Sequence, residues 1–376
     1  MNARQGIGNR GQGSRIISGL KTGLVVLLEF ATLFVLGEMA SRLSIGPGLV
    51  FTNPQMVVDP HPTRIYDLRP NQNSFTIDKP FVTNSMGFRE NREIPLEKNG
   101  EFRILSLGDS IAVGLGVTAE DTYAAQLEKR INQPSVKVIN AAVGSYSTWS
   151  EVDLLKEKGL KIRPDIVMIA FFWNDLYKKP VPVLPLSDSA QQADARTQSL
   201  RWLKQSSLLM FLRERLEILS FRFFSPTFDW AHQEMIYEGR SSAYLEEAYK
   251  QTGSSLEEFK ALADANGFIP LLIIVPIPSQ VHHLDAPTHM QQHITELARR
   301  AGIRVVDLLS PMQHAYQTNP DLFIPWDNVH FTPQGHRVIA ETLEQYLVTE
   351  DLLRQKKIVS FRGDGNNFAS PSVSHP

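Results

Sequence analysis

Beyond residue 100, short apolar runs alternate with longer amphipathic stretches. Five of the runs are rich in β-branched residues and apolar enough to be strands buried on both faces. They are Arg103–Leu107, Val136–Asn140, Ile166–Phe171, Pro270–Val275 and Arg304–Asp307. The clearest helical stretches are Tyr123–Ile131, Ser150–Lys158, Leu256–Ala265, Met290–Ala301 and Pro333–Val348. This alternation predicts an α/β protein: a three-layer α/β/α, flavodoxin-like sandwich with a five-stranded parallel sheet.

The N-terminal region has a different pattern, with one apolar run from Thr22 to Gly37. A helix needs about 20 residues to cross a bilayer. The run reaches that length when Ile16 to Gly37 spans and Lys21 extends toward the headgroups. Glu29 costs roughly 2.5–3.5 kcal/mol at mid-bilayer, which the surrounding leucine, valine and phenylalanine side chains offset. We therefore expect one N-terminal transmembrane helix, a signal anchor over residues 16–43.

A cleaved signal peptide and an amphipathic surface helix are the competing interpretations. Glu38 and Arg42 stand where a cleavage site requires small neutral residues, and the run lacks a cationic face. Basic residues precede the run, so the positive-inside rule places residues 1–15 in the cytoplasm. The prediction is a single-pass membrane protein whose main domain is extracytoplasmic, in the periplasm or at the cell surface.

The remaining segments differ in composition. Residues 44–100 are rich in proline, asparagine and charge, as in a juxtamembrane stalk or strap. The α/β domain is expected over 101–350, with a mostly helical insertion at 178–250, and 351–376 is expected to be a disordered tail. The insertion is interpreted either as a cap with its own small core or as a lid over an acyl pocket or against the membrane. Its aromatic residues are Trp202, Phe211, Phe221, Phe223, Phe224, Phe228 and Trp230.

Overall composition narrows the class of protein. The 376 residues are 42% hydrophobic and 21% charged, with a formal net charge of -2. Such a chain buries one large core and has no global field to attract nucleic acid, so no nucleic-acid partner is expected. The chain has no cysteine, which excludes disulfides, thiol nucleophiles and thiolate zinc sites.

Candidate chemistry lies where loops leave the carboxyl ends of the predicted strands, the edge at which open parallel sheets bind ligands. A serine needs a base within hydrogen-bonding reach, and that base needs a third group to orient it. Ser110 follows the first strand, and Asp327 and His330 follow the fifth, three residues apart. The catalytic residues are therefore expected to be Ser110 as nucleophile, His330 as general base and Asp327 as orienting acid.

An oxyanion also needs hydrogen-bond donors. The backbone N–H groups of Ser110 and Gly144 and the side-chain amide of Asn174 come from three of these loops. We expect them to form the oxyanion hole. The chemistry requires no metal and no other cofactor.

Four blocks in this order resemble the SGNH (GDSL-type) hydrolase family, membrane-anchored type. They are Ile104 to Ser110, Gly144, Asn174-Asp175 and Asp327 to His330. The resemblance covers roughly Phe102 to Val348, and the upstream segment Asn84 to Arg89 resembles one that often precedes the domain in anchored members. It implies the SGNH hydrolase fold and a serine esterase activity.

Two features depart from that family pattern, and several residues have plainer interpretations. Phe172 stands where the third block usually has glycine, and the insertion before the fourth strand is long. Asp109 is expected to cap the next backbone amides, Asn174 is also a candidate for satisfying buried backbone, and His336 is expected on a helix face. A degenerate, inactive domain on the same fold is the alternative to catalysis.

A histidine-rich stretch forms a separate candidate site. His282, His283, Asp285, His289 and His293 cluster in sequence, and His289 and His293 at i,i+4 have the spacing of a metal-binding pair. No metalloprotease glutamate accompanies them. The favoured interpretation is a polar loop entering a helix.

The sequence thus predicts a serine esterase that hydrolyses acyl esters, such as O-acetyl esters, of an envelope glycan or lipid through an acyl-enzyme. One alternative is an O-acyltransferase whose acyl-enzyme is intercepted by a sugar hydroxyl. The other is a non-catalytic glycan-binding scaffold. The expected partners are the acyl-ester substrate and the membrane, the latter through the N-terminal helix.

Overall fold

The structure is a computed structural model that describes residues 10–48, 50–52, 54–176, 203–223, 235–325, 327 and 329–353. The chain divides into two compact units. One comprises residues 1–50 and 197–225, and the other comprises residues 51–196 and 226–376. The predicted cytoplasmic tail 1–15 is largely outside the described residues, as are most of the C-terminal tail and the insertion segments 177–202 and 224–234.

The larger unit is built on a five-stranded parallel sheet of order β6-β5-β7-β8-β9, which confirms the predicted fold class. The strands are β5 (Phe102–Gly108), β6 (Val136–Asn140), β7 (Ile166–Phe171), β8 (Ile269–Ile274) and β9 (Arg304–Asp307). Each lies within one residue of its predicted range. Every residue of the central strand β7 is buried, as expected when helices cover both faces.

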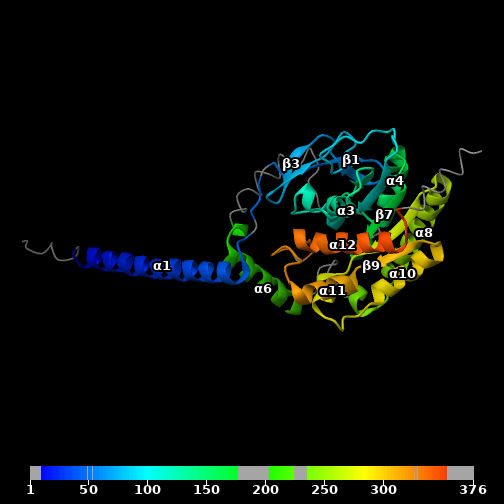
Figure 1. Cartoon of the computed structure of the whole chain (residues 1–376). Helices are drawn as coiled ribbons and strands as arrows, with labels where there is room; N and C mark the ends of the chain where they lie inside the picture. Colours follow the sequence, from blue (N-terminus) through cyan, green and yellow to red (C-terminus); the bar gives the residue numbers. More distant parts are fainter. Residues whose placement is uncertain are drawn as a thin grey trace, which may run out of the picture. The chain divides into compact units, whose positions relative to one another are not determined.

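Helices cover the two faces of the sheet (Figure 1). Helix α3 (Tyr123–Ile131) packs against α12 (Pro333–Thr349), while α4 (Thr148–Glu157) packs against α8 (Ala243–Asn266), which packs against α10 (His289–Ala301). Right-handed crossovers explain this division, because the chain moves one way from β5 to β6 and the other way from β6 through β9. The shorter helices are α2 (Ser110–Val113), α9 (Pro278–His282) and α11 (Leu309–Thr318), with 3₁₀ turns η1 (Ala119–Asp121), η2 (Gly159–Ile162) and η3 (Trp173–Leu176).

Residues 54–100, which precede the sheet, pack against the rest of the larger unit. It forms two antiparallel hairpins, β1 (Val58–His61) with β2 (Ile65–Leu68) and β3 (Asn73–Thr76) with β4 (Lys79–Val82). Val58, Tyr66 and Phe81 are fully buried in the common core. Of the two interpretations for residues 44–100, a free stalk and a strap, the contacts of residues 54–100 favour the strap.

The outer edge of β6 is protected by side chains. Strand edges carry unpaired backbone groups that invite pairing with another chain. Here the Glu128 carboxylate accepts from Val138 N at 2.7 Å, and the Glu90 carboxylate accepts from Asn140 N at 2.8 Å. These acceptors occupy amides that an added strand would need.

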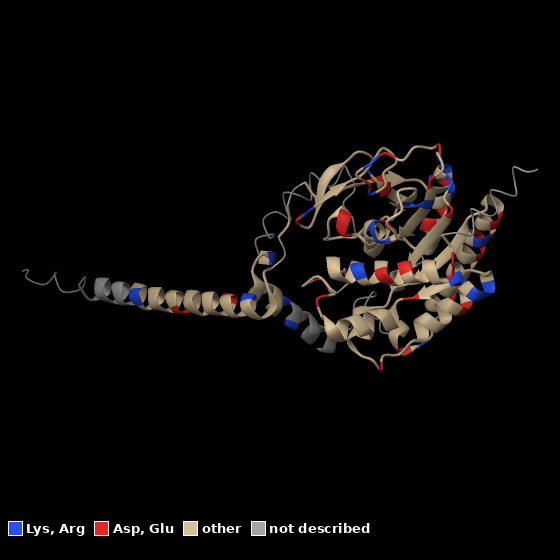
Figure 2. Cartoon of the chain, viewed as in Figure 1, with Lys and Arg blue, Asp and Glu red and all other residues tan. Residues whose placement is uncertain are grey.

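The smaller unit contains α1 (Arg10–Ile45) and α6 (Ser207–Phe223). Residues Gly19–Ile45 are long and apolar enough to cross a membrane, a test that signal sequences also pass. Few charged residues interrupt this part of α1 (Figure 2). The Glu38 carboxylate accepts from Ser207 N at 3.0 Å and from Leu208 N at 2.9 Å, so a residue of α1 caps the positive end of α6.

Candidate active site

The turn from β5 into α2 carries Ser110. Gly108 has φ of 151°, and a Cβ there would lie 2.5 Å from the Ala112 Cβ, so glycine is required for this turn. Asp109 caps α2 by accepting from Ile111 N at 2.9 Å, as the sequence suggested. The cap places Ser110 as the first residue of α2.

The second and third blocks meet this turn. Val143 N donates to the Gly108 carbonyl at 3.0 Å, which brings Gly144 next to the β5–α2 turn. Burial raises the pKa of Asp109, while its hydrogen bond from the Ile111 amide and the nearby Asn174 and Ser110 side chains oppose the shift. Asn174 therefore lies beside the same carboxylate as Ser110.

Asp327 and His330 form a close pair. Asp327 Oδ2 lies 2.7 Å from His330 Nδ1, while Asp327 Oδ1 accepts from Val329 N at 3.1 Å and from His330 N at 3.0 Å. These three hydrogen bonds fix the carboxylate against one ring nitrogen. The other nitrogen, His330 Nε2, is buried and has no hydrogen-bond partner among the described residues.

The electrostatics of the pair suit a general base. Burial alone would lower the pKa of His330, but the charge and hydrogen bond of Asp327, together with the charge of Asp109, outweigh it and raise the pKa. The pKa of Asp327 is lowered despite burial, because His330 and the two amides favour its charged form. The effect of Asp109 on His330 also places the fourth block near the turn that carries Ser110.

No hydrogen bond joins Ser110 Oγ to His330 Nε2 among the described residues. Nor do the backbone amides of Ser110 and Gly144 donate to a described protein acceptor. Asn174 Oδ1, which is an acceptor, is also buried and has no hydrogen-bond partner among the residues that the structure describes. Catalytic hydrogen bonds often tighten only once substrate is bound, and amides without a protein acceptor are what an oxyanion requires.

Other residues singled out in the sequence have structural surroundings. His336 is buried, its Nδ1 accepts from Tyr123 N at 3.2 Å, and burial lowers its pKa to about 3. Phe172, the departure from the family pattern, is buried and lies edge-on to Trp173 with ring centroids 6.1 Å apart. The Phe172 side chain therefore belongs to the hydrophobic core.

The histidine-rich stretch does not converge in the described structure. His282 packs on the Tyr316 ring at 4.6 Å, and His293 stacks on the Tyr249 ring at 4.0 Å. The described residues with metal-like spacing are instead His61, Asp67 and Glu157.

The sequence did not reveal that the segment before the sheet contacts the site. The buried guanidinium of Arg89 donates to the carbonyls of Val113, Gly114 and Val117, at and just beyond the end of α2. The Tyr66 hydroxyl donates to the Gly144 carbonyl at 2.8 Å. The only signal for the first contact was the Asn84 to Arg89 segment, and no sequence pattern indicated the second.

A cleft of about 460 Å³ lies elsewhere in the larger unit, beside β6 and α3. Glu90, Arg92, Glu128 and Lys137 line it, and none of the candidate catalytic residues does. Its carboxylates already accept from the edge of β6, so the cleft is not assigned to the chemistry.

A family model described as the GDSL-like Lipase/Acylhydrolase family matches residues 106–338. The matched range includes every candidate catalytic and oxyanion residue. No curated protein matches the sequence.

Solved structures resemble this chain at low identity. LAE5, an alpha/beta hydrolase enzyme from the metagenome of Lake Arreo, Spain, is 16% identical with a TM-score of 0.41, over 68% of this chain and 99% of that one. An acetyl xylan esterase, AlAXEase, is 13% identical with a TM-score of 0.40, over 65% and 100%. A lipolytic G-D-S-L protein from Veillonella parvula DSM 2008 is 15% identical with a TM-score of 0.38, over 64% and 95%. TM-scores below 0.5 do not support a shared substrate.

Proposed function

The chain belongs to the GDSL-like lipase/acylhydrolase family, a family of ester-bond hydrolases, and we propose that it is a serine esterase using Ser110, His330 and Asp327. The Asp327–His330 contact of 2.7 Å carries the proposal, because it leaves His330 Nε2 as the nitrogen available to a hydroxyl. The convergence of the Ser110 turn with the Gly144 and Asn174 loops supports it.

The reaction follows from these positions. Ser110 Oγ attacks the ester carbonyl while His330 Nε2 takes its proton, and Asp327 stabilises the imidazolium that forms. The amides of Ser110 and Gly144 and the Asn174 side chain stabilise the oxyanion. His330 then protonates the leaving alcohol. Water attacks the acyl-enzyme carbonyl while His330 takes its proton, and His330 returns that proton to Ser110 Oγ as the acyl–Oγ bond breaks and the acid leaves.

The proposed substrate is an acyl ester, such as an O-acetyl ester, of an envelope glycan or lipid. Support comes from the apolar helix Gly19–Ile45 and the basic residues before it, which favour an extracytoplasmic domain. Retention of the helix as an uncleaved anchor is supported by Glu38, because removing α1 would leave the start of α6 without its capping carboxylate.

The test uses the full chain in detergent micelles. A fluorophosphonate probe should label the wild type, and p-nitrophenyl acetate should be hydrolysed. Ser110→Ala should abolish both, and His330→Ala should reduce both at least about 10³-fold. The matched controls Ser310→Ala and His283→Ala change exposed residues and should keep wild-type rates.

Three other outcomes discriminate among functions. Labelling with little hydrolysis until a sugar acceptor is added would indicate an O-acyltransferase. A folded wild type that neither labels nor hydrolyses ester would refute catalysis and favour a glycan-binding scaffold. Full activity in Ser110→Ala would show that another residue is the nucleophile.

A further inference from the structure

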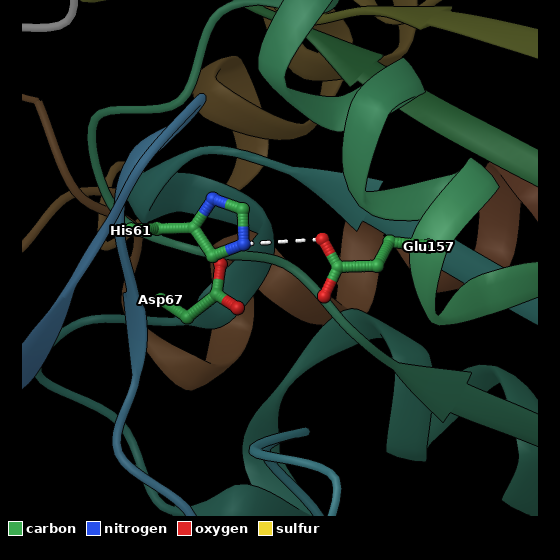
Figure 3. A group of neighbouring side chains, drawn as sticks. All are labelled: His61, Asp67 and Glu157. Carbon is green, nitrogen blue, oxygen red and sulfur yellow. Dashed lines mark ion pairs between the residues drawn. The ribbon is translucent and has the colours of Figure 1, made fainter.

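His61, Asp67 and Glu157 form a group that resembles a metal site, since their donor atoms lie within 4.8 Å of one another (Figure 3). A guanidinium already occupies the group. Arg64 Nη2 lies 3.1 Å from His61 Nε2 and 3.0 Å from Asp67 Oδ2, and Arg64 Nη1 lies 2.8 Å from Glu157 Oε2. The positive charge between these three side chains is therefore that of the Arg64 guanidinium and not that of a metal ion.

Arg64 joins the β1–β2 hairpin to helix α4. It sits in the turn of the hairpin, its side chain is fully buried, and it donates to Asp153 at 3.0 Å and to Glu157, both on α4. A buried guanidinium that lost these partners would be strongly destabilising. The hairpin is thus held in one position on the helix that follows the Gly144 loop.

From this fixed hairpin, Tyr66 reaches the candidate oxyanion loop. Its hydroxyl donates to the Gly144 carbonyl at 2.8 Å. A second link runs the opposite way, since the Tyr146 hydroxyl lies 2.6 Å from both the Tyr66 carbonyl and Asp67 Oδ1. Tyr66 and Tyr146 are both buried, so water does not compete for these hydrogen bonds.

Gly144 needs such support because glycine restricts its own backbone least. Its N–H belongs to the peptide between Val143 and Gly144, and the carbonyl of that peptide, Val143 O, accepts from Tyr146 N at 3.2 Å. Its carbonyl belongs to the peptide on the other side, next to Ser145, a non-glycine residue with φ of 64°. A backbone in this region persists only when its surroundings hold it. Tyr66 holds the carbonyl side.

We propose that Tyr66 is a positioning residue of the oxyanion hole: it fixes the Gly144 carbonyl while Tyr146 N holds the Val143 carbonyl, so rotation about the Gly144 Cα is limited and the Gly144 N–H keeps one direction. The inference rests on the proposed esterase function and deepens it. It makes the β1–β2 hairpin, which lies outside the matched family domain, part of the catalytic apparatus. Burial raises the pKa of Tyr66 to about 12, so the hydroxyl stays a donor at neutral pH.

The test is the full-length variant Tyr66→Phe, assayed for kcat and KM on p-nitrophenyl acetate and for thermal unfolding. Losing an oxyanion donor outright costs about 10²–10³ in kcat. Misdirecting one donor of three should lower kcat about 10-fold and leave KM within about 2-fold. Tyr146→Phe, which cuts the second link, should lower kcat in the same direction.

Tyr123→Phe is the matched control. Tyr123 is equally buried, and its hydroxyl is hydrogen-bonded at 2.7 Å to Ser106 Oγ on β5 and not to the Gly144 loop. It should lose a similar amount of thermal stability while keeping kcat within about 2-fold. A purely structural role for Tyr66 would make the two variants alike.

The outcomes separate the two proposals. If the wild type is active and Ser110→Ala is inactive, but Tyr66→Phe keeps wild-type kcat, the positioning role is wrong and the esterase stands. A Tyr66→Phe that raises KM instead of lowering kcat would also overturn it. If the wild type neither hydrolyses ester nor labels, the proposed function fails, and the positioning role fails with it.

Discussion

Asp327→Asn isolates the contribution of the carboxylate that faces His330. The two side chains are nearly isosteric. The asparagine oxygen can still accept from the backbone amides of Val329 and His330, now at 3.1 and 3.0 Å from Asp327 Oδ1. The loop should therefore keep its shape, and only the atom opposite His330 Nδ1 changes from an acceptor to an NH₂ donor.

That change selects the wrong form of histidine. An NH₂ group opposite Nδ1 favours the tautomer with Nδ1 unprotonated, which puts the proton on Nε2 and leaves nothing to accept the proton of Ser110. The same substitution in a Ser-His-Asp protease lowers kcat about 10⁴-fold. A factor of 10⁴ corresponds to about 5.4 kcal/mol of transition-state stabilisation. We expect a fall of about this size here.

The pH profile supplies a second readout. Activity needs neutral His330, whose pKa Asp327 raises above 6.5, so wild-type kcat/KM should rise with pH through a pKa above that value. In Asp327→Asn the pH at which the remaining activity increases should be lower than in the wild type. Burial lowers the pKa of His330, and the variant lacks the carboxylate charge that raises it.

Steady-state hydrolysis of p-nitrophenyl acetate between about pH 5 and about pH 9 measures both effects. Asp321→Asn, an exposed position on the same loop, is the matched control and should keep the wild-type rate and profile. Asp327→Asn with kcat within 10-fold of wild type and an unshifted profile would refute the assignment of the triad acid.

Two further predictions concern stability. Arg64→Met removes a fully buried guanidinium from its carboxylate partners and should lower the free energy of unfolding by about 3 kcal/mol in chemical denaturation; a loss under about 1 kcal/mol would show that the hairpin does not depend on this cluster. Burial raises the pKa of Glu151 well above 4.5, so the folded chain binds a proton that the unfolded chain has lost, and this residue reduces stability as pH rises above about 4.5. Glu151→Gln should therefore flatten the decline of the melting temperature between about pH 5 and about pH 8, and an unchanged slope would contradict the buried proton.

The local pattern of apolar and polar residues was sufficient to predict the positions of most strands and helices. Strands buried on both faces are continuously apolar, so β5, β6, β7 and β8 were placed within one residue of their structural bounds. The bounds of β9 were also predicted correctly, but the expectation that it is buried on both faces was wrong, because it is an edge strand with Arg304 and Asp307 exposed. The predicted start of α12 at Pro333 is also correct, and the hydroxyl of the preceding Thr332 caps the helix by accepting from Gly335 N at 3.2 Å. Helix α8 was placed too short, because Gly253 and its neighbouring serines weaken the helical pattern. The structure continues it from Ala243 to Asn266, since packing overrides propensity where Thr252 and Ser255 are buried.

The sequence by itself determined the fold class and the order of the candidate chemical residues along the chain, because both depend on short-range patterns and on spacing within single loops. Asp327 and His330 are three residues apart, so one turn suffices to pair them. The tertiary structure alone decided the order of the strands and the role of the hairpin before the sheet. Arg64 meets α4 about 90 residues later and Tyr66 meets Gly144 across 78 residues, and neither contact leaves a periodic signal in the sequence. Contacts of this kind form only when the sheet brings remote segments together.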